Sequence, residues 1–499
     1  MIQDRSTFAD LMTVGGAGFQ LTSYVVDAQQ AYLTRADAAD RVLNLLRVLR
    51  NHPQGPERVG TIGYQGFFYH FLGIDGLRKQ NFDFVETPED ESQNTVELSA
   101  IDTGLVLAGV VTAGQYFDDP GNPVEAEIRQ LAEEIYGRVD FRFLLDPASN
   151  QFYLGWKPNE TRDDSGKWGR YLLDDAEGTG QYSSKSVGGV EVPATIDYYT
   201  DEGLLLALLA MGSPNPAHRL GREVWDAMIR DTAGGDFVRS FPGSLFTYEF
   251  ASVWLDTNRL GLDNHPTTPV DFFVNTQAAV QATRMYVEAN PLNRATWQNH
   301  ARLWGLSAAE GPLDAYHAYA APTAALVQPL EDGTVTVYGA ASAVVHDWFA
   351  ATDSLWAAAE QDLLHPRFGY ADAYNADVAD AIEAAGVFTP EPQYLPSSGP
   401  WANFTGFAID QGPMALMVDN YLSHNLVPDR FMSEPHIQRA LMTLFPDVAG
   451  DDPPIDPPSS KIDHLEEFSD DWGVYREGNP TWDIGNVTPP VPLDGDALR

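Results

Sequence analysis

The chain has 499 residues, of which 44% are hydrophobic and 11% aromatic, so it can bury at least one large core. It carries 71 acidic and 30 basic residues, and the resulting net charge of −41 would repel nucleic-acid phosphates and anionic lipid surfaces. We therefore expect neither nucleic acid nor a membrane as a partner. Cysteine is absent, which excludes disulfides, thiolate metal ligands and thiol nucleophiles.

Lysine is scarce in this acidic chain, at 5 of the 30 basic residues. Many carboxylates with little lysine are typical of a halophilic protein, because concentrated salt screens the self-repulsion. Residues 1–20 lack the basic segment followed by an apolar one that marks a signal peptide. The localisation stays open: cytoplasmic as written, or exported if a further N-terminal segment exists.

Apolar residues that recur every three or four positions predict helices along most of the chain. The segment 36–50 has a broad apolar face, 94–117 is mostly apolar and rich in small residues, and 125–139 is amphipathic. The best strand candidate is GTVTVY at 333–338. Further helices are expected at 202–211, 270–290 and 412–426.

Long segments rich in Trp, Tyr, Gly and Asp separate these helices, notably 151–200 and 376–404. Aromatic faces beside carboxylates and amides suit sugars, whose C–H faces stack on rings while their hydroxyls need polar partners. Residues 447–499 are acidic and proline-rich, which predicts a C-terminal tail. The first domain is therefore expected to end at residue 446.

Twelve segments resemble, in the same order, those of the glycoamylase-like domain family, which includes the endo-β-1,2-glucanases. The most informative are YYTDEGLLLALLAMGSP (198–214), FGYADAYN (368–375) and IDQGPMALMVDNY (409–421). The others lie at 14–24, 66–72, 97–118, 127–141, 153–160, 245–256, 304–316, 332–344 and 431–441.

This resemblance implies an all-α fold, an (α/α)₆ toroid over residues 1–446, with an active site at one mouth. The family opens with a further helix before its Asp-Arg pair, whereas Asp4 and Arg5 begin this chain, so we expect the first helix to be missing. Other departures are Tyr248-Glu249-Phe250 in place of His-Gln-Tyr, Ser252 in place of His, and Asp419 in place of Glu.

The resemblance also implies an inverting glycoside hydrolase that cleaves β-glucan, and β-1,2-glucan is the expected substrate. Such an enzyme needs one protonated acid for the leaving oxygen and one carboxylate that activates water. Glu202, at the start of an apolar helix, is the expected general acid, and Asp410, before a helix expected near Pro413, the general base. Ordinary helix-terminus electrostatics for Glu202 and an N-cap role for Asp410 are the structural alternatives.

Asp102 is the third expected catalytic residue, because a lone carboxylate in an apolar helix needs a partner or a solvated cavity. A buried salt bridge with an arginine is its structural alternative. Glu97 precedes Asp102 by five residues, so at roughly 100° per residue it lies about 140° away from Asp102 around an ideal helix. The residues expected to bind substrate are Glu97, Tyr69, His70, Trp156, Trp254, Trp304, Glu310, Asp372 and Tyr374.

The eleven histidines show no metal-binding spacing, and no nucleotide motif or serine elbow is present, so we expect no metal and no cofactor. The expected partner is an oligosaccharide or polysaccharide substrate. Two alternatives remain open at this point: a relative in the same fold that uses another linkage or transfers glycosyl groups, and an inactive fragment or carbohydrate-binding protein.

Overall fold

The computed structural model describes residues 1–79, 96–159, 170–299, 302–312, 316–365, 369–377 and 400–446. The chain divides into two units, Met1–Ala449 and Gly450–Arg499, and all of the described residues belong to the first. The tail predicted at 447–499 therefore lies outside the described residues. No helix within the described ranges combines the length and the apolar character that crossing a membrane requires.

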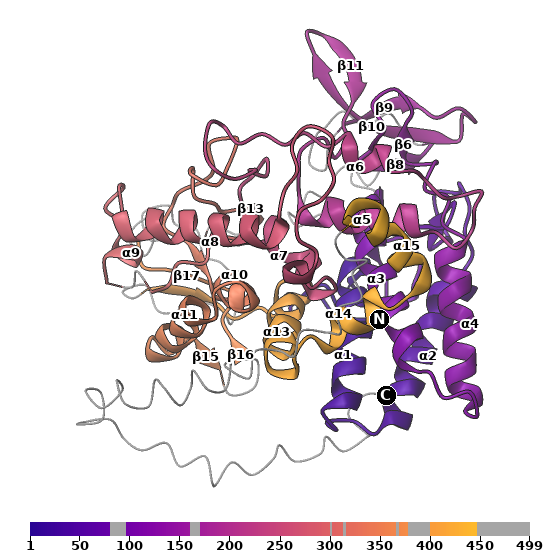
Figure 1. Ribbon diagram of the computed structural model, residues 1–499, viewed down its shortest axis with the longest axis horizontal. Helices are drawn as coiled ribbons and strands as arrows, with labels where there is room; N and C mark the ends of the chain where they lie inside the picture. The colour runs from indigo at the N-terminus through magenta and orange to yellow at the C-terminus, as the bar shows by residue number, and fades with distance from the viewer. Residues whose placement is uncertain are drawn as a thin grey trace. The chain divides into compact units, whose positions relative to one another are not determined.

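Four long helices near the N-terminus pack together in one group (Figure 1). Helix α3 is buried along almost its whole length, whereas α4 has one apolar face, as their sequences predict. Thr34 caps α2 and Ser99 caps α3, each through its side-chain oxygen. The four are α1 (Val14–Gln29), α2 (Arg35–Asn51), α3 (Ala100–Tyr116) and α4 (Pro123–Gly137).

Helices α1 and α3 approach so closely that glycine is required on both. A Cβ atom added at Gly18 would lie 2.1 Å from the carbonyl oxygen of Leu105, and one added at Gly109 would lie 2.3 Å from the carbonyl oxygen of Gly18. Real Cβ atoms do not approach backbone atoms to such distances. The two backbones are therefore in direct contact, and this contact fixes the position of α1 on α3.

Helix α13 (Ala408–Ser423) lies between α1 and α10 (Val337–Ser342), as Figure 1 shows. It begins four residues before the predicted helix at 412–426, which was expected to start near Pro413. Pro413 instead lies inside α13. Proline lacks an N–H group, which removes one hydrogen bond of the first two turns without ending the helix. Asp410 therefore lies in the first turn of α13 and not in a loop before it.

Helix α5 (Asp201–Gly212) packs on α3 and on α15 (Pro435–Leu444), and its N-cap is Thr200. The predicted helix at 202–211 is therefore present, one residue longer at each end. The remaining helices are α6 (Glu223–Asp226), α7 (Phe246–Glu249), α8 (Phe272–Ala289), α9 (Ala295–Asn299), α11 (Trp348–Glu360) and α14 (Leu426–Met432), with 3-10 turns η1 (Phe250–Val253), η2 (Thr257–Arg259) and η3 (Ala343–Val345).

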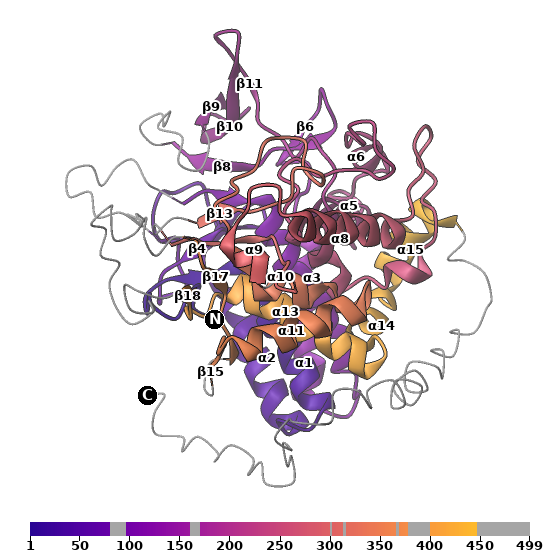
Figure 2. The ribbon, with the colours of Figure 1, turned by 90° about the vertical axis from the view of Figure 1, so that its left-hand side faces the viewer.

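The expectation of an all-α toroid is wrong, because the segments between the helices form several antiparallel sheets. The largest has seven strands in the order β11-β10-β8-β5-β3-β2, with β9 paired to β10. Figures 1 and 2 show β10 and β11 extending away from the helices. Its strands are β2 (Gly63–Tyr64), β3 (Phe67–Tyr69), β5 (Leu98–Ser99), β8 (Gly155–Pro158), β9 (Arg170–Asp174), β10 (Gly180–Val187) and β11 (Val190–Pro193).

Smaller sheets carry further site residues. The predicted strand at 333–338 contributes only β14, and α10 begins at Val337. Most of these strands have two or three residues, too few to show the alternation by which a strand is recognised in a sequence. They are β1 (Met12–Thr13) with β4 (Phe71–Leu72), β6 (Leu145–Asp146) with β7 (Gln151–Phe152), β12 (Ala308–Glu310) with β13 (Tyr316–Ala318), β14 (Val335–Thr336) with β17 (Ala373–Asn375) and β18 (Trp401–Asn403), and β15 (Leu364–His365) with β16 (Gly369–Tyr370).

Replacing Gly109 by alanine should destabilise the fold by about 1–3 kcal/mol, because the new methyl group forces α1 away from α3. Gly104 on the same helix is the matched control: a Cβ added there meets its nearest neighbour, Leu206 Cδ1, at an ordinary 3.6 Å. Gly104→Ala should be neutral or stabilise by up to about 1 kcal/mol, the gain in helix propensity. Urea unfolding of the two variants and the wild type measures the difference, and equal stabilities would contradict the proposed contact.

Candidate active site

His70 is held between two carboxyl groups. Tyr69 pairs with Leu98 in the antiparallel β3–β5 ladder, so His70 and Glu97 come next to each other at the end of the two strands. The imidazole Nδ1 lies 2.8 Å from Glu97 Oε1, and Nε2 lies 3.5 Å from Asp102 Oδ2. Burial alone would lower the pKa of His70, but Asp102 and Glu97 outweigh it and raise the pKa to about 9. This pKa favours the cationic form of the half-buried imidazole at neutral pH.

Asp102 lies in the first turn of α3, where it forms a reciprocal cap with Ser99. Ser99 Oγ donates to Asp102 Oδ2 at 2.6 Å and accepts from the Asp102 backbone N–H at 3.1 Å. Gly15 leaves room for the carboxyl, since a Cβ there would lie 2.5 Å from Asp102 Oδ1. Burial raises the pKa of Asp102, although His70 and Ser99 oppose the rise. The cation beside Asp102 is thus a histidine rather than the arginine considered from the sequence.

Glu202 is the second residue of α5 and is half-buried. Burial, followed by the negative charges of Asp201 and Asp102, raises its pKa well above the ordinary range. These surroundings favour the protonated form of Glu202. The influence of Asp102 also places Glu202 near the histidine-centred group described above.

Asp201 and Glu249 form a buried pair behind Glu202 that the sequence analysis did not select. Asp201 Oδ2 accepts from the backbone N–H of Ala251 at 2.8 Å. Among the described residues, no donor reaches either carboxyl oxygen of Glu249. Burial and the charge of Asp201 raise the pKa of Glu249 well above its usual value. Its surroundings therefore favour the neutral form of Glu249, and the departure from the family pattern at this position was its signal in the sequence.

Asp372 and Asp410 form a second group of carboxyls, and each is 0% exposed. Asp372 directly precedes β17. Among the described residues, no donor reaches either carboxyl oxygen of Asp372. Burial and the charge of Asp410 raise the pKa of Asp372 well above the ordinary range. Burial raises the pKa of Asp410 to about 8, against the hydrogen bond from Tyr316. Two carboxyls this close in a buried site disfavour the ionisation of both at once.

Tyr316 contacts Asp410 from the β12–β13 hairpin. Its hydroxyl group donates to Asp410, with Oη 3.1 Å from Oδ1 and 3.4 Å from Oδ2. Glu310 is the residue opposite Tyr316 in this hairpin, so the two enter the site together. The sequence analysis predicted Glu310 but missed Tyr316, because nothing in the sequence pairs residues 94 positions apart.

Arg5 anchors the N-terminal segment to this second group. Its Nε donates to Asp4 Oδ2 at 2.9 Å, and its Nη1 lies 3.7 Å from Glu310 Oε1. The guanidinium carbon lies 4.6 Å from the ring centroid of Phe407, the N-cap residue of α13. Asn403 Nδ2 donates to the other oxygen of Glu310 at 3.2 Å. The N-terminal segment is therefore part of the wall around Asp410.

Asp4 connects the two groups of carboxyls. Its negative charge contributes to the raised pKa of Asp410 and to the raised pKa of His70. Asp102 in turn acts on both His70 and Glu202. Glu202 and Asp410, far apart in sequence, thus belong to one connected set of buried and half-buried acids.

The aromatic residues predicted to bind substrate are buried in the core. Trp254 stacks on Phe19 with ring centroids 5.0 Å apart, and its Nε1 donates to Thr22 Oγ1. Large aromatic side chains are commonly buried in the core in this way. None of the five rings exposes more than 3% of its surface: Tyr69, Trp156, Trp254, Trp304 and Tyr374.

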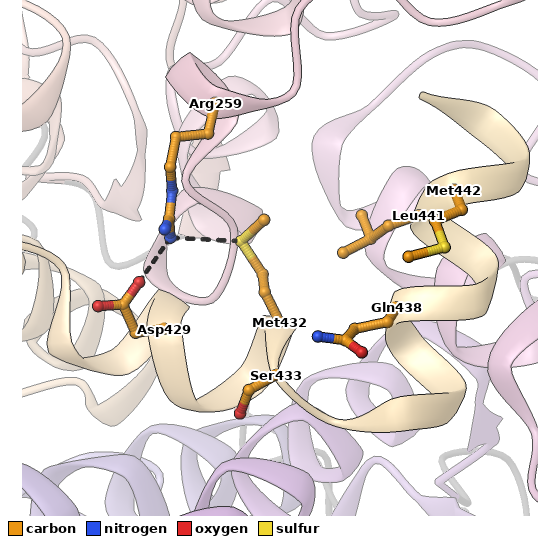
Figure 3. Close-up of a pocket in the computed structure, with 7 residues that line it drawn as sticks. All are labelled: Arg259, Asp429, Met432, Ser433, Gln438, Leu441 and Met442. Carbon is orange, nitrogen blue, oxygen red and sulfur yellow. Dashed lines mark hydrogen bonds and ion pairs between the residues drawn. The ribbon is translucent and has the colours of Figure 1, made fainter. Parts of the chain in front are cut away.

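A pocket of about 260 Å³ lies apart from the carboxyl groups, among η2, α14 and α15 (Figure 3). Arg259 in this pocket is paired with Asp429 at 2.7 Å. Within the described ranges, no three His, Asp or Glu side chains converge as a metal site requires. The pocket is lined by Arg259, Asp429, Met432, Ser433, Gln438, Leu441 and Met442.

Residues 195–435 match the Glycoamylase family model, whose description is "Putative glucoamylase". The predicted resemblance to this family is thereby confirmed. The matched range contains Glu202, Glu310, Asp372 and Asp410, and it does not contain the His70 group.

A curated relative is the exo β-1,2-glucooligosaccharide sophorohydrolase (non-reducing end) of Parabacteroides distasonis, 21% identical over 464 residues. The alignment covers 87% of this chain and 53% of the relative, so the chain spans about half of the relative's length.

Two solved structures share the fold. The endo-β-1,2-glucanase of Chitinophaga pinensis, in complex with sophorotriose and glucose, superposes with a TM-score of 0.62 and 19% identity over 89% of this chain and 90% of that chain. The β-1,2-glucanase of Parabacteroides distasonis gives a TM-score of 0.63 and 17% identity over 89% of this chain and 56% of that one. At these identities the similarity is one of fold.

The imidazole of His70 should titrate with a midpoint near pH 9 in the folded protein, and the midpoint should fall in Glu97→Gln, which removes one of its two anionic partners. This pKa lies above that of an unfolded histidine, which is about 6.5. The interaction of His70 with Glu97 and Asp102 therefore stabilises the fold fully below about pH 6.5. The contribution is lost as the pH rises through about 9. NMR titration of the His70 ring measures the midpoint, and a value below 6.5 would contradict the arrangement.

Proposed function

We propose that the protein is a member of the glycoamylase family, which its residues 195–435 match, and that it is a glycoside hydrolase that cleaves β-glucan, with β-1,2-linked glucose as its substrate class. The observation that carries the proposal is the connected set of acids that joins half-buried Glu202 to buried Asp410. The β-1,2-glucan activity named for the relatives supports the choice of linkage.

Glu202 is the general acid in this proposal. It must carry a proton at working pH and reach the glycosidic oxygen, and it combines a raised pKa with partial exposure at the N-terminus of α5. Burial is the main cause of this raised pKa, and the neighbouring acids Asp201 and Asp102 add to it when they are ionised; both are buried, and Glu202 alone among the three is half-exposed. Protonation of the leaving oxygen by Glu202 begins bond cleavage.

Asp410 is the proton acceptor for the attacking water, which enters on the opposite face of the sugar and inverts the anomeric carbon. Asp372 supports this role because burial and the charge of Asp410 raise its pKa well above the ordinary range, which favours its neutral form and makes Asp410 the acid of the pair that ionises first. Asp102, Glu97 and His70 then bind sugar hydroxyls near Glu202, and Glu310 does so near Asp410.

We also propose that the protein works in concentrated salt, because a net charge of −41 favours expansion at low ionic strength. In 1 M salt the Debye length is about 3 Å, which screens most of this repulsion. Activity is therefore best measured in molar potassium chloride, on a panel of β-glucans of defined linkage. Reducing-sugar release identifies hydrolysis, whereas new glycosidic products without reducing sugar identify transfer.

Changing Glu202 to Gln should lower kcat on β-1,2-glucan by about 10²–10⁴-fold, because the general acid is lost. Binding of β-1,2-linked oligosaccharides, measured by calorimetry, should stay within a few-fold. Glu127→Gln is the matched control, since Glu127 is a partly exposed residue of α4 paired only with Arg47, and this variant should keep its activity. Near-normal turnover in Glu202→Gln would refute the assignment of the acid.

The pH dependence of kcat/KM reports the free enzyme and should therefore show the titration of Asp410. The carboxyl group of Asp410 must be ionised to accept a proton. The value of kcat/KM should therefore be low at acid pH and should rise as the pH increases through about 8. At still higher pH the rate should fall again, when Glu202 loses its proton. A profile that stays flat between pH 6 and 9 would contradict Asp410 as the acceptor.

A further inference from the structure

Asp410 is fully buried, yet the proposed function requires it to take a proton from a molecule in the substrate groove. Three described side chains act on its carboxyl group, Asp372, Tyr338 and Tyr316, and of these three only Tyr316 makes a hydrogen bond to it. Asp372 and Tyr338 are each 0% exposed, and the Tyr338 hydroxyl is already donated to the carbonyl oxygen of Ala308 at 2.6 Å. Tyr316 differs from both, because 43% of its surface is exposed.

We infer that the hydroxyl group of Tyr316 is a catalytic residue that relays the proton from the attacking water to Asp410. This inference rests on the proposed function and names the group through which its proton acceptor works. The Tyr316 hydroxyl spans both oxygens of Asp410, at 3.1 and 3.4 Å, and the residue as a whole is partly exposed. Donation to a buried carboxylate leaves the lone pairs of the phenol oxygen available for a water molecule.

The geometry of the hairpin supports a fixed position for this hydroxyl. Tyr316 lies opposite Glu310 in the β12–β13 ladder, and Glu310 accepts from Asn403 and lies near Arg5. The Tyr316 ring also contacts the ring of Phe407, with centroids 5.9 Å apart. The phenol is thus held from both strands and from the N-terminus of α13, which is the element that carries Asp410.

The relay conserves atoms and charge. As the water oxygen forms its bond to the anomeric carbon, one water proton passes to Tyr316 Oη, and the phenolic proton passes to Asp410. The bond between the anomeric carbon and the glycosidic oxygen breaks, and that oxygen takes the proton of Glu202. At the end Tyr316 is unchanged and neutral, Asp410 is protonated, Glu202 is ionised, and the product has a free hydroxyl at an inverted anomeric carbon.

The test compares Tyr316→Phe with the wild type on β-1,2-glucan in molar potassium chloride. The variant keeps the ring against Phe407 and removes only the hydroxyl, so kcat should fall by at least about 10²-fold while KM changes by less than a few-fold. Tyr319→Phe is the matched control. Tyr319 lies three residues after Tyr316 in the chain, and its hydroxyl donates to Asp332 at 3.4 Å and not to Asp410. It should keep kcat within about threefold.

A second substitution separates the hydroxyl from the fold. 3-Fluorotyrosine at position 316 keeps both the ring and the hydroxyl, and it should retain most of the wild-type kcat. Activity of Tyr316→Phe within threefold of the wild type would overturn the relay while the proposed function stands. An equal loss in Tyr319→Phe, or a loss in the fluorotyrosine protein as large as in Tyr316→Phe, would also overturn it. Absence of glucan cleavage by the wild type would overturn the proposed function and the relay with it.

Discussion

Backbone contact between α1 and α3 is the constraint on which both groups of acids depend. Gly18 and Gly109 let the two helices touch without intervening side chains. Gly15 on α1 leaves space for the carboxyl of Asp102 on α3, and Gly412 on α13 leaves space for Phe19 on α1. Helix α1 is therefore seated closely against both the helix that carries Asp102 and the helix that carries Asp410.

A displacement of α1 would change the distances among three acids at once. The segment before α1 holds Asp4 and Arg5, and an isolated backbone bridge joins Arg5 to Phe407 at the start of α13. Close-packed interiors resist small displacements, because each methylene group has a neighbour at van der Waals distance. The fold thus fixes the spacing of groups whose pKa values depend on one another, and that spacing would be lost in a more loosely packed helical protein.

Helices could be predicted from the sequence wherever burial imposes a period. The amphipathic segment 125–139 became α4, and the apolar segment 94–117 became α3 with β5 before it. The sheets could not be predicted, because strands such as β3 and β5 are short and pair with segments distant in the chain. The pairing energy comes from neighbours that a local window does not contain, and this non-local term is why the all-α expectation failed.

The site was partly predictable for the same reason. Carboxyls such as Glu202, Asp410 and Asp102 stand out because apolar surroundings are costly for them. Their partners, among them Tyr316 and Arg5, have no such signature and are selected by tertiary contacts. The predicted aromatic residues, such as Trp254, show the reverse limitation, since a large ring looks the same in a sequence whether it packs in a core or faces a ligand.

Charge balance explains why each group of acids can hold a proton. Around Asp410 the described residues place Asp4, Glu310 and Asp372 with a single guanidinium, that of Arg5. Four buried or half-buried carboxyls beside one cation disfavour full ionisation, and the pKa values of both Asp372 and Asp410 are accordingly raised.

Acids also outnumber cations around Glu202. His70 and Lys157 lie near Glu97, and His70 also lies near Asp102. Asp201 and Glu249, in contrast, have no cation among their described neighbours. The pKa values of the three acids at or near α5, Glu202, Asp201 and Glu249, are therefore raised well above their ordinary values. In the proposed mechanism the acid and the base would therefore differ through the cations around them, with no difference in residue type required.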